Sequence, residues 1–381
     1  MRIGIDGLHL FGPYGGVQNA LARTVGALRK DFPTDELFLY VPRDFKGPPE
    51  AGEDKGLQVR RAFFSGRWRT VRTLWRNFRL QPNAYRDTCE VLHGATYALP
   101  TALSMPAVVT IHDTIALSHP EFATPGSARL QKRLLPRSAK VARRVQVPTE
   151  AVKAEVERRL EVQGDKIDVV PWGVGVDFRV IDERKRLDVA RKEWSLPEKF
   201  MLFVGTLEPK KNIEALIMGF YAAKVNKRLP HALVFAGRMG WGIHRLKQLI
   251  HEHNAREYIL FTDYVPENAL PLLYNLADLC ILPSQIEGFG PPVLEAFACG
   301  CPVLVSDAPA LVEVAGGAAH VFKQDAAKPL QPVREALETL LVDGDRLRME
   351  LREKGLRRVK EFTWQRTAEL TRKSYEKALG T

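Results

Sequence analysis

Two glutamates that stand eight residues apart form the strongest chemical signal in the sequence. They lie in the stretch Ser284-Gln285-Ile286-Glu287-Gly288-Phe289-Gly290-Pro291-Pro292-Val293-Leu294-Glu295, which follows the apolar run Leu279–Pro283. The glycines let the backbone approach a ligand closely, and the prolines favour a helix start. A helix start offers free N–H groups and a positive dipole end to an anion. Glu295 would then lie one turn into the helix, where a carboxylate can bind two adjacent hydroxyl groups. A plain strand-loop-helix crossover is the alternative.

Cationic side chains follow two other apolar runs. Glu208-Pro209-Lys210-Lys211-Asn212 comes after Met201–Gly205 and just before a helical pattern, and Gly237-Arg238 follows Leu233–Ala236. Lysines at a helix start oppose the helix dipole, which makes sense if they face a phosphate. Each motif alone is more often a solvated surface cation. Together they predict that Lys211 and Arg238 share one sheet edge with Glu287 and Glu295.

The first half of the chain holds two weaker patterns. The turn Gly12-Pro13-Tyr14-Gly15-Gly16-Val17 precedes a helix, as a phosphate-binding turn would, with a plain loop as an equal alternative. It lacks the G-x-G-x-x-G spacing, which disfavours a dinucleotide cofactor. His112-Asp113 ends the apolar run that begins at Val108, and it is a candidate for orienting a substrate or handling a proton. A structural histidine is the alternative there.

Short apolar runs alternate with amphipathic stretches along the chain, which predicts right-handed βαβ units in doubly wound parallel sheets. Ligands bind such sheets beyond the carboxyl ends of the strands. The predicted helices include Ala151–Leu160, Ile213–Ala223, Arg245–His253 and Pro292–Ala298. The predicted strands are Ile3–Asp6, Leu37–Val41, Leu57–Arg61, Val91–His93, Val108–His112, Val145–Pro148, Ile167–Val170, Met201–Gly205, Leu233–Ala236, Ile259–Thr262, Leu279–Pro283, Pro302–Ser306 and Ala319–Phe322.

This alternation is interrupted once, which indicates two domains. The turn-rich segment Pro171–Asp177 leads into the charged segment Asp182–Trp194, and we place the linker there. The sequence thus predicts one Rossmann-like domain over residues 1–178 and a second over residues 195–362, facing each other across a cleft. A final helix over residues 364–381, with Thr363 as its N-cap candidate, completes the chain.

The net charge of +11 is uneven. Gly56–Arg86 holds eight arginines and no acid, and Arg129–Arg144 holds seven basic residues and no acid. In the region 67–79, apolar residues recur at helical spacing among arginines, which predicts a basic amphipathic helix able to dock on an anionic membrane. A core-packing helix with solvated arginines is the alternative. The residues concerned are Trp68, Val71, Trp75 and Phe78, with Arg67, Arg69, Arg72, Arg76 and Arg79.

Other features limit the location and the chemistry. No apolar run reaches the roughly 18 residues of a membrane-spanning helix, and the start does not resemble a signal peptide, so we expect a cytoplasmic protein. No two cysteines show C-x-x-C spacing, and we expect all four to be reduced and structural. They are Cys89, Cys280, Cys299 and Cys301.

The motifs resemble those of glycosyltransferase family 4, a large retaining family with the GT-B fold. The E-x7-E pair Glu287–Glu295, the stretch Glu208–Asn212, the turn Gly15-Gly16 and the pair His112-Asp113 occur in the family's order. The resemblance implies a nucleotide-sugar donor held by the second domain, and a glycan or lipid-linked acceptor held by the first. It also implies that the tail helix crosses back to the first domain.

The resemblance assigns roles to particular residues. Glu287 would contact the donor sugar near the reacting face, and Glu295 would bind the ribose. Lys211, with Arg238, would hold the diphosphate, while His112 would touch the donor sugar. The residues that complete the nucleotide-sugar site would be Gly15, Gly16, Gly288, Phe289, Gly290 and Val293.

Departures from the family pattern refine this expectation. Thr206 stands where much of the family has an arginine, so Arg238 becomes the candidate second cation. The Gly-Thr-Leu-Glu-Pro variant looks closest to bacterial mannosyltransferases of surface polysaccharides, which favours GDP-mannose as donor. Asp343-Gly344-Asp345 matches the D-x-D pattern of metal-dependent transferases but lies in a charged stretch far from any strand end. We read it as a surface turn, and we expect no metal and no cofactor.

Three rival hypotheses use the same sequence differently, one of them a non-catalytic sugar-nucleotide-binding subunit, which a turnover measurement would decide. A nucleic-acid-binding protein would use the basic N-terminal half and would show strong salt dependence. No recognised RNA or DNA module occurs, however, and the glutamate pair would have no role, so we expect no nucleic-acid partner. A sugar-nucleotide epimerase or a phosphorylase would keep the GT-B fold. A phosphorylase would carry pyridoxal phosphate on a lysine, which an absorbance spectrum detects.

Overall fold

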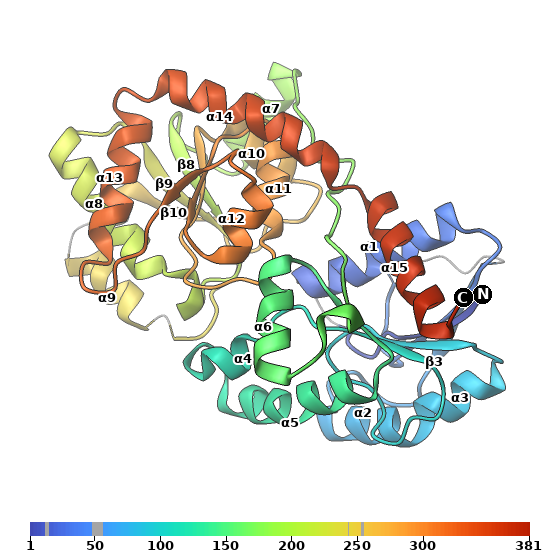
Figure 1. Ribbon diagram of the computed structural model, residues 1–381. Coiled ribbons are helices and arrows are strands. Elements are labelled where there is room, and N and C mark those ends of the chain that lie inside the picture. Colours follow the sequence, from blue (N-terminus) through green and yellow to red (C-terminus); the bar gives the residue numbers. More distant parts are fainter. Residues whose placement is uncertain (12–14, 48–55, 243, 253–254) are drawn as a thin grey trace. The chain divides into compact units, whose positions relative to one another are not determined.

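A computed structural model describes residues 1–11, 15–47, 56–242, 244–252 and 255–381 (Figure 1). The chain forms two compact units, one of Met1–Gly173 with Thr363–Thr381 and one of Val174–Phe362. The segment predicted as the linker contains helix α7 (Arg184–Glu193), which is part of the second unit. No helix in the described parts of the chain is both long and apolar enough to cross a membrane.

The first unit is built on a parallel sheet of seven strands in the order β3-β2-β1-β4-β5-β6-β7. Each strand forms at a predicted apolar run, with ends that differ by at most two residues. The strands are β1 (Arg2–Asp6), β2 (Glu36–Val41), β3 (Leu57–Arg61), β4 (Val91–Gly94), β5 (Ala107–Thr110), β6 (Arg144–Val147) and β7 (Ile167–Val169).

Helices cover both faces of this sheet, which explains why its strands are apolar throughout. One face packs against α1 (Gly16–Asp31) and the tail helix α15 (Trp364–Leu379). Thr363 caps α15 by accepting a hydrogen bond from the Arg366 N–H. The opposite face packs against α2 (Arg69–Trp75), the π-helical η1 (Arg76–Leu80), α3 (Gln81–Arg86), α5 (Pro125–Val141) and α6 (Glu150–Leu160). The short α4 (Ile115–Ser118) precedes α5.

A chain of buried hydrogen bonds fixes α15 to the sheet. The Tyr375 hydroxyl lies 2.8 Å from His93 Nδ1, and His93 Nε2 lies 2.7 Å from the Thr110 hydroxyl. Thr110 donates to Gln146 Oε1, and Gln146 Nε2 donates to the Thr371 carbonyl. Because an amide oxygen can only accept, Thr110 must accept from His93 Nε2–H. Tyr375 then donates to the unprotonated Nδ1, so the chain requires a neutral His93.

The second unit is built on a parallel sheet of six strands in the order β10-β9-β8-β11-β12-β13. Its strands also match predicted runs: β8 (Phe200–Val204), β9 (Ala232–Ala236), β10 (Ile259–Phe261), β11 (Leu279–Leu282), β12 (Val303–Ser306) and β13 (His320–Phe322). Its helices, besides α7, include α8 (Ile213–Lys227), α9 (His244–Glu252), α10 (Leu270–Leu276), α11 (Pro291–Ala298), α12 (Pro309–Ala315), α13 (Leu330–Leu341) and α14 (Asp345–Arg358). The predicted helix end His253 lies outside the described residues.

The strand order reverses between β1 and β4 in the first sheet, and between β8 and β11 in the second. These switch points are where doubly wound sheets bind ligands. The predicted pair of Rossmann-like sheets is thus confirmed. The four cysteines are free and buried, as expected. Asp343 lies on the connection between α13 and α14, Asp345 is the first residue of α14, and both are exposed.

Candidate functional site

Glu287 and two lysines meet at the β8–β11 switch point. Glu287 follows β11, while Lys210 and Lys211 belong to the short turn η4 (Pro209–Lys211) after β8. Lys211 Nζ donates a hydrogen bond to Glu287 Oε1, and Lys210 Nζ lies 3.7 Å from Glu287 Oε2. The Gln285 N–H donates to the Lys210 carbonyl over 2.7 Å. This backbone bond joins the two loops and holds the three side chains together.

The charges around Glu287 fix its protonation state. Its side chain is only 8% exposed, and burial acts to raise its pKa. The charges of Lys211 and Lys210, with the hydrogen bond from Lys211, outweigh burial and lower the pKa of Glu287 to about 2. The carboxylate is therefore ionised at neutral pH. It can accept hydrogen bonds from hydroxyl groups, but it cannot supply a proton.

The loops after β8 and β9 run side by side at this edge. Leu207 and Met239 form an isolated parallel bridge. A Cβ atom on Gly237, whose φ is +156°, would lie 2.0 Å from the Gly205 carbonyl oxygen, so only glycine permits this approach. Arg238 follows directly, exposed, with its guanidinium 4.5 Å from the centre of the Tyr264 ring. It lies at the predicted sheet edge, but its side chain stacks on an aromatic ring.

Glu295 has a different partner from Glu287. It lies on α11, where its Oε2 accepts a 2.8 Å hydrogen bond from the hydroxyl of Tyr274 on α10. Burial raises the pKa of Glu295 to about 7, against the lowering effect of the Tyr274 hydrogen bond. Near neutral pH this side chain is therefore a mixture of carboxylic acid and carboxylate. Tyr274 had no signal in the sequence, because a tyrosine in an apolar helix is usually a core residue.

The start of α11 differs from its predicted role in one respect. Pro291 and Pro292 open the helix, as predicted, but proline has no N–H group. The Val293 N–H donates to the Gly290 carbonyl over 3.0 Å. The first three helical residues therefore offer no free N–H group, contrary to the expectation, and at these positions α11 offers an anion only its dipole. Gly290 adopts φ +89°, which suits glycine, while Phe289 and Val293 are buried beside it and Gly288 precedes them.

His112 lies just after β5 in the first unit. Its Nε2 is 2.9 Å from the Ala95 carbonyl oxygen, which can only accept, so Nε2 carries the proton. Nδ1 is buried and has no hydrogen-bond partner among the described residues. Burial lowers the pKa of His112, against the raising effects of the Ala95 bond and Asp113. The neutral ring thus presents an acceptor nitrogen, and it packs in a T-shaped arrangement with the Trp172 ring, 5.4 Å between ring centres.

The predicted Gly-Gly turn leads into α1. The Gly15 N–H donates to the Gln18 side chain over 3.1 Å, and helix α1 begins at Gly16. Both glycines are exposed. The preceding residues Gly12, Pro13 and Tyr14 of the same predicted turn lie outside the described residues.

The region 67–79 does not form the predicted amphipathic stripe. Trp75 is buried against the sheet and Arg76 is buried beside it, whereas Trp68 and Phe78 are 55% and 70% exposed. The α-helix changes to a π-helix at Arg76. A π-helix holds more residues per turn than an α-helix, so the spacing i, i+3, i+7, i+10 no longer defines one face. The side chain of Arg69 lies outside the described parts.

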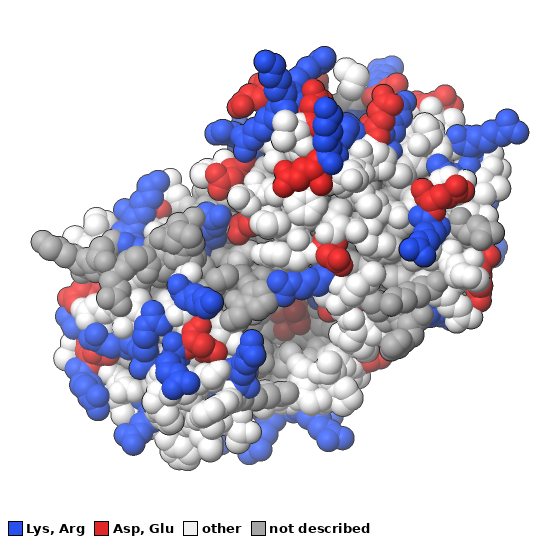
Figure 2. All heavy atoms as spheres, turned by 180° about the vertical axis from the view of Figure 1, so that it is seen from behind, with Lys and Arg blue, Asp and Glu red and all other residues white. Residues whose placement is uncertain are grey.

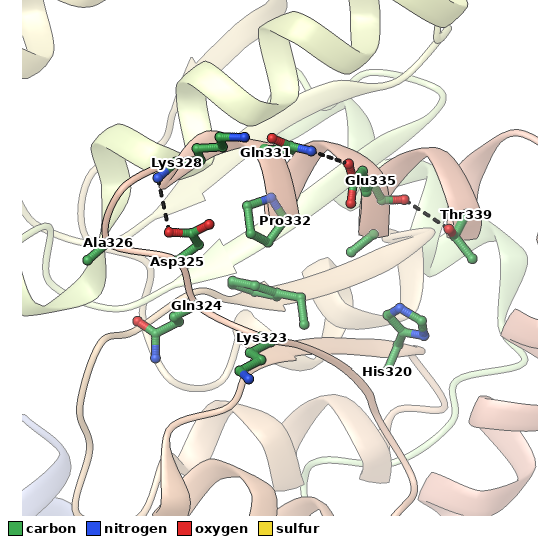
Figure 3. A pocket seen from close by; sticks show the side chains of 12 residues that line it. His320, Lys323, Gln324, Asp325, Ala326, Lys328, Gln331, Pro332, Glu335 and Thr339 are labelled. Carbon is green, nitrogen blue, oxygen red and sulfur yellow. Dashed lines mark hydrogen bonds between the residues drawn. The ribbon is translucent and has the colours of Figure 1, made fainter.

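A cavity of about 680 Å³ lies elsewhere in the second unit, between β13 and α13 (Figure 3). None of the predicted site residues lines it. Its carboxylates already bind neighbours: Asp325 accepts from the Lys328 N–H, and Glu335 accepts from Gln331. In the described residues, no group of three or more histidine, cysteine or acidic side chains is arranged to hold a metal ion.

Comparisons with known proteins agree with this architecture. The family model "Glycosyltransferase Family 4" matches residues 14–178, and "Glycosyl transferases group 1" matches residues 185–358. "O-antigen chain mannosyltransferase B" of Escherichia coli is 29% identical over 78% of this chain and 77% of its own length. "Serotype-specific mannosyltransferase WbdA" of Escherichia coli is 31% identical over 61% of this chain, a stretch that spans 28% of that protein.

Solved structures show the same fold. Sucrose-phosphate synthase from Thermosynechococcus elongatus superposes over 100% of this chain and 99% of its own, with a TM-score of 0.79 and 18% identity. A two-sheet glycosyltransferase of the GT-B type is therefore the class that fold and sequence define. The chain belongs to glycosyltransferase family 4.

Proposed function

We propose that this glycosyltransferase moves a hexose, with retention of configuration and without a metal, from a nucleoside-diphosphate sugar to a glycan or lipid-linked acceptor. The observation that carries the proposal is the ionised Glu287, held against Lys210 and Lys211 at the β8–β11 switch point. Cations and a carboxylate at one sheet edge match the two halves of such a donor. The lysines suit its diphosphate, and the carboxylate suits the hydroxyl groups of its sugar.

The difficult step is the departure of the nucleoside diphosphate from the anomeric carbon. Negative charge builds on the leaving phosphate, and preorganised cations stabilise it most effectively. Lys211 and Arg238 are the proposed cations, aided by the dipole of α11. Glu287, ionised throughout, accepts hydrogen bonds from the donor sugar, while Glu295 accepts them from the ribose. His112 offers its Nδ1 lone pair to a sugar hydroxyl group. Gly15, Gly16 and the loop Gly288–Gly290 line the proposed nucleotide-sugar site.

Mannose from GDP-mannose is the proposed transferred group. The mannosyltransferase names of two relatives support this donor, as does the Gly-Thr-Leu-Glu-Pro variant. Thermal-shift measurements with GDP-, UDP- and ADP-sugars test it. A donor at 100 times its dissociation constant should stabilise the protein by about 2.7 kcal/mol. Stabilisation by UDP- or ADP-sugars alone would reject GDP-mannose, and no stabilisation by any of them would reject the donor site.

The acceptor side of the proposal includes an anionic membrane surface around residues 67–79. Trp68, Leu74 and Phe78 are at least half exposed there. Helix α5 packs on the same sheet face, and its exposed side includes Lys132, Arg133, Arg137 and Lys140. On the side that Figure 2 shows, basic side chains predominate over the first unit. Exposed apolar groups beside cations suit a peripheral position on the inner face of the cell membrane.

Flotation with liposomes that contain anionic lipid tests this surface. We expect binding that weakens as salt rises, and we expect Leu74→Ser/Phe78→Ser to reduce it. Val321→Ser, which removes an exposed apolar group from the second unit, serves as the matched control. Equal flotation with neutral and anionic liposomes, or no flotation with either, contradicts the membrane surface.

A further inference from the structure

Arg76 is a buried arginine whose hydrogen-bonding capacity is only partly used. Its side chain is 5% exposed, and its Nε donates over 2.5 Å to Oδ2 of the fully buried Asp6. The other oxygen of Asp6 accepts the Leu8 N–H over 3.0 Å. Asp6 is thus occupied on both oxygens. Arg76 Nη2 is buried and has no hydrogen-bond partner in the part of the chain that the structure describes.

An unpartnered buried donor on a charged group is costly, and native proteins almost always satisfy such groups. The contact to Asp6 uses Nε and leaves Nη2 for another acceptor. A ligand oxygen is one way to meet this demand. Burial of the guanidinium among few partners would strengthen such a contact, because water competes little there.

The position of Arg76 also indicates a ligand site. Asp6 ends β1, which neighbours β4 at the switch point of the first sheet. Arg76 is the first residue of η1, and π-helical turns occur frequently at functional sites. The π-helical turn at Arg76 and the strand order at Asp6 therefore both indicate a ligand site at the β1–β4 switch point.

The local charge favours an anion. The pKa of His9, three residues after Asp6, is lowered by burial and further by the charges of Arg76 and Arg72. Arg72 lies with its guanidinium 5.0 Å from the centre of the Phe11 ring and donates to the Gly66 carbonyl. The guanidinium groups of Arg76 and Arg72 thus both act on His9, and Asp6 is the carboxylate paired with Arg76. A cationic ligand would be repelled here, and an oxyanion would be attracted.

We propose that Arg76 binds a phosphate group of the acceptor substrate at the β1–β4 switch point. This inference rests on the proposed function, in which the first unit holds the acceptor. The Nη2 N–H donates to a phosphate oxygen, Asp6 holds the guanidinium in position, and Arg72 adds positive potential. The Arg76 contact thus favours an acceptor that is a phosphate ester over a neutral glycan.

Binding of methyl phosphate to the full-length protein tests the proposal. The readout is the NMR signal of the His9 imidazole, assigned with His9→Gln, since a phosphate at Arg76 raises the pKa of that ring. We expect saturable binding to the wild type. In Asp6→Asn/Arg76→Gln, which replaces the ion pair by an amide pair, we expect the dissociation constant to rise about tenfold or more. Arg79→Gln, an exposed arginine of the same π-helix, is the matched control and should bind normally.

Further variants separate the possible outcomes. Arg76→Lys keeps the charge, and it should bind more weakly than the wild type even if the double variant fails to fold. Equal binding by the wild type, Arg76→Lys and a folded double variant overturns the proposal. So does binding that is lost in Lys211→Ala, because the phosphate would then occupy the donor site. The double variant should still bind GDP-mannose. If the wild type binds methyl phosphate at Arg76 but no sugar nucleotide, the proposed function fails and the phosphate site stands.

Discussion

Glu287 and Lys211 neutralise each other in the absence of a ligand, and this pairing has a consequence for donor binding. In the proposed function, a bound diphosphate would give Lys211 a second anionic partner, and the sugar hydroxyl groups would give Glu287 new hydrogen-bond donors. The ion pair thus keeps two charges in place at a largely buried site, ready for the partners that the proposed donor would supply. Removal of either side chain leaves the other without its main counter-charge.

We predict that Glu287→Gln and Lys211→Ala each lower kcat by roughly 100- to 1000-fold, the usual cost of losing one preorganised charge contact. Steady-state kinetics measures this effect, and circular dichroism checks that the fold persists. Lys323→Ala, an exposed lysine of the same unit, should keep normal turnover. Near-normal turnover in either site variant would reject the site.

The pKa of Glu295, raised by burial to about 7, predicts a pH dependence of donor binding. Ionised Glu295 is the better acceptor for two ribose hydroxyl groups. Donor affinity should therefore rise between pH 6 and pH 8, and Glu295→Gln should flatten this rise. Calorimetric titration with GDP-mannose measures both. An equally steep pH dependence in Glu295→Gln would assign the effect to another group.

The raised pKa of Glu295 makes the folded protein less stable as pH rises, although donor affinity should increase over the same range. Because the folded-state pKa of Glu295 lies above the unfolded value of 4.5, its stabilising contribution is complete below pH 4.5 and is lost as pH rises to about 7. Burial of this side chain is thus a cost at neutral pH. A ligand that gives the carboxylate hydrogen-bond donors would offset this cost.

The residues that carry the site could be found from the sequence only where they follow strands. Glu287, Lys211 and Arg238 were predicted at one sheet edge because parallel strands place their carboxyl ends together. Tyr274 and Arg76 were not, because each sits within a helix and meets its partner only through the tertiary fold. No spacing rule links Arg76 to Asp6, 70 positions earlier.

Among the elements, the strands were the most predictable. Buried parallel strands are continuous apolar runs, and each of the thirteen predicted runs forms one of the thirteen strands found in the described residues. The helical region 67–79 is less predictable, because its apolar spacing fits an α-helix of about 3.6 residues per turn, whereas the chain adopts a π-helical turn there. Such a turn depends on which side chains pack against the sheet, and Trp75 and Arg76 are both buried.

Helix α15 depends on the protonation state of one histidine. Burial, with a minor effect of His112, lowers the pKa of His93 from 6.5 to about 3. As the pH falls from 6.5 towards 3, the unfolded chain takes up a proton that the folded protein does not. Stability should therefore fall by up to about 1.4 kcal/mol per pH unit from this group alone.

We predict that His93→Gln is less stable than the wild type at pH 7, because it disturbs the bond to Tyr375. We also predict that it loses less stability between pH 7 and pH 4.5. Urea unfolding at both pH values measures the two differences. His251→Gln, a change at an exposed histidine of α9, is the control. An unchanged pH dependence in His93→Gln would show that His93 is not held neutral.

For the whole molecule, the charge separates by unit. The first unit carries 30 basic and 20 acidic side chains, a net charge of +10, whereas the second carries 26 and 25, a net charge of +1. The excess positive charge therefore lies on the first unit, which is the proposed acceptor unit. It suits anionic acceptors and surfaces, and it leaves the proposed donor unit to rely on local cations.

We predict that deleting residues 363–381 lowers the unfolding temperature of the first unit and leaves the second unit folded. The tail helix supplies Ala368, Tyr375 and Ala378 to the core of the first sheet. Calorimetry should show one transition at lower temperature and one that GDP still shifts upward. Loss of both transitions would contradict the independence of the second unit, and no change would contradict the role of α15.

The return of the chain to its first unit after Phe362 also sets an order of events during translation. The ribosome releases the whole of the second unit before Trp364–Leu379 leave the exit tunnel. The second unit can therefore complete its core first. The first unit, although it is made earlier, keeps one apolar face of its sheet exposed until α15 is released. Nascent first units are the stage at which we expect chaperones to engage this protein.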